Sequence, residues 1–260
     1  MRPARVTAGP APVVLVAHGS RDPRAAVETE ALSRAVAAAR PGLPVRASYL
    51  DHRGPRPGEV LTELAAAGHP YAVVVPLLLT AAYHGRVDIP GAIAAAQAAG
   101  LRMPVRVAEV LGPARGEVHP LLLAGLRRRL AEAASRGAGD GEVDAVVLAA
   151  AGTRDAAARR TVEEAAEALG AALDVPALVG YASAAPPTAG EAVTRLRVAG
   201  ARRVAVATYF LAPGRLCETA MRSAREAGAV ALAAPLGDSA ELAGLVLARL
   251  DDALTGVPTP

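Results

Sequence analysis

Residues 15–22 read Leu15-Val-Ala-His-Gly-Ser-Arg-Asp22, and residues 148–155 read Leu148-Ala-Ala-Ala-Gly-Thr-Arg-Asp155. Five of the eight positions are identical at an offset of 133 residues, and each segment follows a valine-rich run and precedes a long helical pattern. This repeat predicts that the 260-residue chain contains two related halves, of which the second is a diverged copy. We expect α/β domains at 1–136 and 143–260, joined by the Gly- and Arg-rich stretch 135–142.

Short β-rich runs alternate with alanine-rich helical runs along the first half. Strands are expected at 13–17, 45–49, 71–76 and 105–107, and helices at 25–39, 58–67, 91–99 and 119–134. Strands that alternate with helices predict an α/β fold with a parallel sheet in each half and helices on both of its faces. We expect the doubly wound strand order 2-1-3-4.

The composition argues against several classes of protein. The chain has 28 basic residues, all of them arginine, and a net charge of +3, but it has one Phe and no Trp for stacking on bases. We therefore expect no nucleic-acid partner. No apolar run approaches the roughly 18 residues of a membrane span, and residues 1–12 lack the apolar core of a secretory signal, so we expect a cytoplasmic protein without a membrane partner. Cys217 is the single cysteine, which excludes an internal disulfide and a multi-cysteine zinc site.

Three chemically active side chains follow the first three predicted strands. His18 ends the first strand, Asp51 follows the second, and His84 lies in the loop after the third. Their strand ends are neighbours in the order 2-1-3-4, about 4.8 Å apart, so the side chains can converge on one centre. Two imidazoles and a carboxylate suit Fe2+, Co2+, Ni2+ or Zn2+ better than Mg2+ or Ca2+. Imidazole also titrates near neutrality, so either histidine can accept a proton.

Structural roles are open for several of these residues. His18 can be a hydrogen-bonded residue at a strand end, and Asp51 can begin an Asx turn. Ser20 or Asp22 can cap the following helix. The remaining histidines, which also lie in the first 119 residues, are interpreted as surface or capping residues: His52, His69 and His119.

Signature-like segments stand at the ends of three successive strands: residues 15–22, Tyr49-Leu-Asp51 and Pro76-Leu-Leu-Leu-Thr-Ala-Ala-Tyr-His-Gly-Arg-Val-Asp-Ile-Pro90. They resemble the signatures of the sirohydrochlorin chelatase family, whose long members are fused tandem copies of one α/β unit. Phe210-Leu-Ala-Pro-Gly-Arg-Leu216 resembles the degenerate second half of that family. The resemblance implies two tandem flavodoxin-like halves with a cleft between them.

The resemblance also implies an activity, that of a lyase that inserts Fe2+ or Co2+ into sirohydrochlorin in siroheme or cobalamin biosynthesis. Nickel or zinc would replace these ions in vitro, and no redox cofactor is expected. His18 and His84 would be the catalytic, metal-handling histidines, and Asp51 stands where the family usually carries glutamate. Arginine binds carboxylates bidentately, so Arg21, Arg86 and Arg215 are predicted to bind the substrate carboxylates. Ser20 is also predicted to bind the substrate.

Two alternatives remain open from the residues. A non-catalytic carrier of metal or tetrapyrrole would use the same His18, Asp51 and His84 site without turnover. Iron and cobalt share ligand preferences, so the ligand set does not choose between them.

Overall fold

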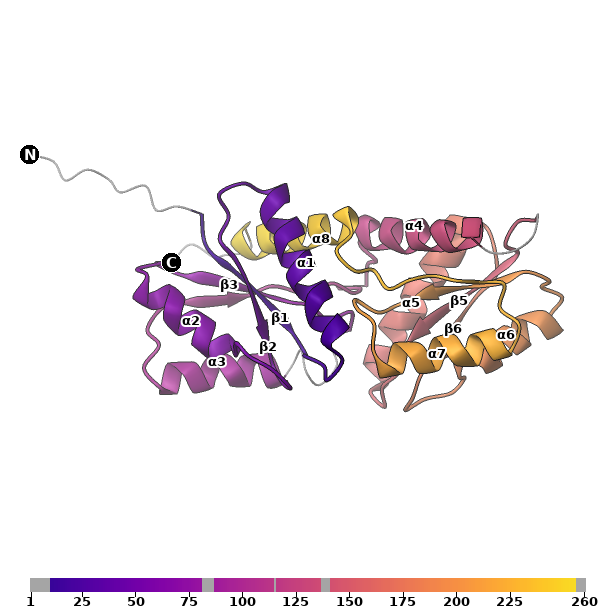
Figure 1. Ribbon diagram of the computed structural model, residues 1–260, viewed down its shortest axis with the longest axis horizontal. Coiled ribbons are helices and arrows are strands. Elements are labelled where there is room, and N and C mark those ends of the chain that lie inside the picture. The colour runs from indigo at the N-terminus through magenta and orange to yellow at the C-terminus, as the bar shows by residue number, and fades with distance from the viewer. Residues whose placement is uncertain (1–9, 81–86, 115, 137–140, 256–260) are drawn as a thin grey trace, which may run out of the picture.

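The computed structural model describes residues 10–80, 87–114, 116–136 and 141–255. Two α/β halves lie side by side (Figure 1). The strands are β1 Val13–Ala17, β2 Val45–Tyr49, β3 Ala72–Pro76, β4 Val105–Val107, β5 Ala145–Ala150, β6 Ala177–Tyr181, β7 Val204–Thr208 and β8 Ala231–Leu232. The helices are α1 Pro23–Ala39, α2 Pro57–Ala66, α3 Ile89–Ala98, α4 Pro120–Arg136, α5 Ala156–Leu173, α6 Ala189–Val198, α7 Arg215–Glu226 and α8 Ala240–Thr255.

Each half is built on a four-stranded parallel sheet, in the order β2-β1-β3-β4 or β6-β5-β7-β8. In the first sheet, Val13 of the central β1 is in register with Val45 on one side and Val73 on the other. The second sheet pairs its strands in the same parallel way. The predicted fold class and strand order are therefore confirmed in both halves.

Alternate side chains of the central strands enter different cores, because successive residues of a strand point to opposite faces. Val14 and Val16 pack with α2 and α3 in a core that belongs to the first half alone. Val13 and Leu15 face the other way, into a larger core that also contains residues of the second half, such as Leu148. One continuous apolar core thus joins the two halves.

Two helices are exchanged between the halves. The C-terminal helix α8 packs against α1 and β3 of the first half, whereas α4 packs against β7 and β8 of the second. Figure 1 shows this exchange, with α8 in yellow beside α1 and α4 in magenta beside the second sheet. The predicted boundaries 1–136 and 143–260 follow the repeat along the chain, while in space each sheet takes one covering helix from the other half.

Polar contacts hold α8 in its position. Arg249, only 7% exposed, donates from Nε to the carbonyl oxygen of Val110 at 2.9 Å and from Nη2 to that of Gly112 at 3.0 Å. Arg40, the C-cap of α1, donates two hydrogen bonds of 2.7 Å to Asp251. A buried guanidinium that is hydrogen-bonded to carbonyl oxygens avoids the cost of an unpaired charge. These contacts tie the last helix to the first half.

The structure also bears on two features of the composition. Within the described residues, no helix is both long enough and apolar enough to cross a membrane. Cys217 in the first turn of α7 is 5% exposed, and burial raises the pKa of its thiol to about 11. The thiol is therefore protonated at neutral pH and is a poor nucleophile.

Candidate active site

The loop after β1 carries His18 and lies directly against the loop after β2. Gly19 has a φ of +92°, and a Cβ atom there would lie 2.0 Å from the carbonyl oxygen of Asp51. The N–H of Asp51 donates to the carbonyl oxygen of His18 at 2.8 Å. Because only glycine fits this conformation and this gap, the sequence places the backbones of His18 and Asp51 side by side.

The carboxylate of Asp51 turns back onto its own loop. Its Oδ1 accepts a hydrogen bond from the N–H of His52 at 2.7 Å, and its side chain is 58% exposed. That hydrogen bond, followed by the charges of His52, Arg56 and His18, lowers the pKa of Asp51 although partial desolvation opposes it. The carboxylate is therefore ionised at neutral pH. It bonds the next residue along the chain, so the hydrogen bond differs from that of an Asx turn.

His52 is a residue that sequence reasoning missed. Its φ is 65°, a left-handed conformation that is uncommon for residues other than glycine. Its ring centre lies 6.2 Å from that of His18, with the ring planes at 75°, and its Nε2 lies 3.8 Å from Oδ2 of Asp51. His52 is exposed, as expected of a surface residue, and its ring also lies close to that of His18. Its position next to Asp51 in the chain was the one signal available.

The second half repeats this backbone without the imidazoles. Gly152 also has a φ of +92°, and a Cβ atom there would lie 1.9 Å from the carbonyl oxygen of Ser183. The N–H of Ser183 donates to the carbonyl oxygen of Ala151 at 3.1 Å, and Ala184 has a φ of 63°. Ala151 and Ala184 therefore occupy the positions of the two histidines.

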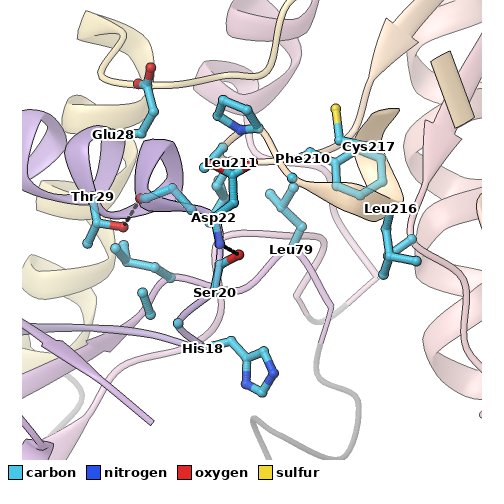
Figure 2. A pocket seen from close by; sticks show the side chains of 18 of the residues that line it. His18, Ser20, Asp22, Glu28, Thr29, Leu79, Phe210, Leu211, Leu216 and Cys217 are labelled. Atoms are coloured by element: carbon cyan, nitrogen blue, oxygen red, sulfur yellow. Dashed lines mark hydrogen bonds between the residues drawn. The ribbon is translucent and has the colours of Figure 1, made fainter. Parts of the chain in front are cut away.

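A cavity of about 890 Å³ lies between the halves. Its walls include His18, Ser20 and His52 from the first half and Phe210, Leu211 and Leu216 from the second. Figure 2 shows His18 and Ser20 on one side and Phe210, Leu216 and Cys217 on the other. The volume is near the upper end of small-molecule sites, roughly 300–1,000 Å³, which suits a large organic ligand. Asp51 lies outside this lining.

Arginines from both halves contribute to the cavity wall. Arg21 and Arg215, both predicted to bind substrate, line it. Arg53, which sequence reasoning missed, also lines it, and its Cζ lies 4.8 Å from the centre of the Tyr49 ring. Guanidinium groups in such a wall favour an anionic ligand.

Ser20 and Asp22 shape the start of α1. Oγ of Ser20 accepts a hydrogen bond from the N–H of Asp22 at 3.0 Å, and Oδ1 of Asp22 accepts one from the N–H of Arg24 at 3.0 Å. Arg24 lowers the pKa of Asp22 and also binds Glu218 of α7, so an ion pair links the two halves. The interpretation of Asp22 as the helix cap is confirmed. Ser20 has this local role and lines the cavity as well.

A tyrosine of the second half holds the loop after β3. The hydroxyl of Tyr209 donates to the carbonyl oxygen of Leu79 at 3.1 Å. Burial raises the pKa of Tyr209, so it remains a neutral donor. Leu79 is further confined by Gly112, where a Cβ atom would lie 1.8 Å from the same carbonyl oxygen. The loop after β3 is therefore held closely at Leu79.

Part of the predicted metal site falls outside the residues that the structure describes. His84 and Arg86 belong to the undescribed segment 81–86. Among the described residues, no group of three or more His, Cys, Asp or Glu side chains is arranged to hold a metal ion. The set of His18, Asp51 and His84 therefore stays a prediction. The structure brings the backbones of His18 and Asp51 together, but the carboxylate of Asp51 lies outside the cavity lining.

Comparison with known proteins follows the same two repeats. The CbiX family model matches residues 12–133 and 145–253. The chain belongs to the CbiX family. The two matched regions of this CbiX-family chain coincide with its two structural halves. A comparison with curated protein sequences gives no significant match.

Solved structures similar to this CbiX-family chain share its fold over nearly the whole length. SirB from Bacillus subtilis with Fe3+ superposes with a TM-score of 0.80 at 21% identity, over 95% of this chain and 96% of SirB. The sirohydrochlorin chelatase SirB from B. subtilis subspecies spizizenii, in complex with cobalt, gives a TM-score of 0.76 at 21% identity, over 94% of each chain. CbiX, described as the terminal enzyme for siroheme biosynthesis in denitrifying bacteria, gives 0.67 at 21% identity, over 94% of this chain and 100% of that one.

Proposed function

We propose that this protein is a sirohydrochlorin chelatase, a lyase that inserts Fe2+ or Co2+ into a carboxylate-rich tetrapyrrole. The observation that carries the proposal is the cavity of about 890 Å³ between the halves, with His18 and several arginines in its wall. Membership of the CbiX family supports the assignment. The similar SirB structures, one with Fe3+ and one with cobalt, support it from the fold.

The reaction exchanges charge evenly, because one divalent ion enters the ring and two protons leave its nitrogen atoms. His18 lies at the end of β1, where its imidazole can bind the incoming ion or accept a ring proton near neutral pH. We assign the second such role to His84 and an ion-orienting role to the carboxylate of Asp51. The pKa of Asp51 is lowered, so its negative charge is available to a cation throughout the neutral range.

The cavity wall supplies two kinds of contact for the ring. We assign Arg21 and Arg215 to the peripheral carboxylates of the substrate, with Ser20 beside them, and we add Arg53 because it lines the same wall. We assign the same task to Arg86, which lies outside the described residues. Apolar side chains such as Phe210 and Leu79 provide surface for the flat macrocycle. The second half thus has a role although it has lost both imidazoles.

An anaerobic absorbance assay tests the proposal, with purified protein, sirohydrochlorin and either Fe2+ or Co2+. The wild-type protein should metallate several rings per chain, and His18→Ala and His84→Ala should each lower the rate at least about tenfold, because each removes a metal-handling or proton-accepting imidazole. His69→Ala is the matched control, since this histidine follows α2 and lies outside the cavity lining.

Two results would contradict the proposal. If the rate equals that of the protein-free reaction with Fe2+ and also with Co2+, the chelatase assignment is wrong. Metallation that stops at one ring per chain would instead identify a carrier.

A further inference from the structure

We propose that His52 forms a two-imidazole metal-binding pair with His18. The ring centres lie 6.2 Å apart and the planes are at 75°. Metal–imidazole bonds of about 2.0–2.1 Å place two ring centres on one ion roughly 5–6 Å apart, so a small side-chain movement would let both rings bind the same ion. The inference rests on the proposed function, to which it adds a specific metal-handling residue.

The backbone directs His52 toward the cavity. His52 lines the cavity, whereas Asp51, the adjacent predicted ligand, does not. Two hydrogen bonds to Asp51 hold His52 in its left-handed conformation. Oδ1 of Asp51 accepts one from the N–H of His52 at 2.7 Å, and the carbonyl oxygen of Asp51 accepts the other from the N–H of Arg53 at 2.8 Å. Such a conformation carries a conformational cost for a residue other than glycine, and the loop maintains it through these bonds.

The second half shows that this loop does not need an imidazole in order to fold. At the corresponding place Ala184 has a φ of 63°, against 65° for His52, and Ala151 stands at the position of His18. Both members of the pair are absent from the half whose loop geometry is otherwise the same. The loop therefore does not need the two imidazoles for its conformation. Because both line the same cavity, we assign them a role in that cavity.

The carboxylate of Asp51 supports the pair from outside the cavity. Its Oδ2 lies 3.8 Å from Nε2 of His52, close enough for electrostatic attraction and longer than a hydrogen bond. A negative charge at this distance also favours a cation held by the imidazoles. Two imidazoles leave coordination positions open on the ion, as transfer to the nitrogen atoms of a ring requires.

Anaerobic titration with Co2+, followed by visible absorbance without tetrapyrrole, tests the pair directly. His52→Ala reproduces the alanine that the second half already tolerates at this φ, so the variant should fold, which the near-ultraviolet circular dichroism would check. We expect His52→Ala and His18→Ala each to weaken Co2+ binding by about 10- to 100-fold and to change the cobalt absorption bands. His69→Ala should bind Co2+ as the wild-type protein does.

His52→Asn separates metal binding from loop shape. Asparagine readily adopts the left-handed conformation but lacks the imidazole, so this variant should bind Co2+ as weakly as His52→Ala. Wild-type affinity and absorption in His52→Asn or His52→Ala would overturn the proposal. Because the titration needs no turnover, weak binding by both variants would support the pair even if no chelatase activity were found.

Discussion

At the scale of single residues, two glycines decide where the loops of the site lie. Gly19 and Gly152 share a φ of +92°, and at each position a Cβ atom would lie within 2.0 Å of a carbonyl oxygen in the neighbouring loop. The same close approach therefore brings together His18 and Asp51 in the first half, and Ala151 and Ser183 in the second. Both halves need the glycine for this loop contact, but only the first half carries imidazoles there.

We predict that Gly19→Ala and Gly152→Ala each lower the free energy of unfolding by about 2 kcal/mol or more, because an L-residue is disfavoured at this φ and its Cβ meets a backbone oxygen. Urea denaturation measures this effect. Only Gly19→Ala should also weaken Co2+ binding, since its loop carries His18 and packs against the loop that carries His52. Equal Co2+ binding by both variants would show that the loop contact does not position the metal site.

At the scale of elements, the start of α4 depends on a histidine. Nδ1 of His119 accepts a hydrogen bond from the N–H of Leu121 at 3.2 Å, which makes His119 the N-cap of the helix. Burial, followed by the positive charge of Arg249, lowers the pKa of His119 below its ordinary value of about 6.5. Our interpretation of His119 as a capping residue is thus confirmed, and the cap requires the neutral imidazole.

This lowered pKa predicts a pH-dependent stability. The unfolded chain binds the proton of His119 more readily than the folded protein, so the stabilising contribution is complete above pH 6.5 and is lost as the pH falls through the lower, folded pKa. His119→Asn keeps an N-cap that does not titrate. The free energy of unfolding of the wild type relative to this variant should therefore decrease below about pH 6.5 in urea titrations. A difference that is constant with pH would exclude the linkage.

At the scale of the whole molecule, the two halves share their largest apolar core, although each also has a smaller core of its own. The largest apolar core includes Leu15 of the first half and Leu148 of the second. The helix α8 covers the first half and α4 covers the second, and Arg249 anchors α8 to the carbonyl oxygens of Val110 and Gly112. Each half therefore lacks a covering helix when the other is absent.

We predict that residues 1–136 alone do not form a stable monomer, because the surface covered by α8 would be exposed to water and α4 would have no sheet to pack against. Size-exclusion chromatography and urea denaturation compare this fragment with the full chain. A monomeric fragment with a cooperative unfolding transition would mean that the first half folds by itself.

Local patterns were enough to predict most of the fold. The strands Val13–Ala17 and Val45–Tyr49 begin and end where the sequence pattern placed them, and the helix expected at 25–39 begins two residues earlier, at Pro23. The alternation of strands and helices, together with the internal repeat, also predicted the parallel sheets and their strand order. The positions of the strands and helices depend on residues that are close in sequence, such as the buried valines of one strand or the cap of one helix.

By itself, the sequence determined the two-half α/β architecture and the places of His18 and Asp51 at neighbouring strand ends. Only the tertiary structure decided that α4 and α8 are exchanged, that Tyr209 bonds the loop after β3, and that His52 faces His18 while the carboxylate of Asp51 lies outside the cavity lining. The physical reason is that each of these depends on contacts between distant segments or on a single backbone angle. The hydrophobic periodicity of the sequence contains no information about contacts between distant segments or about a single backbone angle.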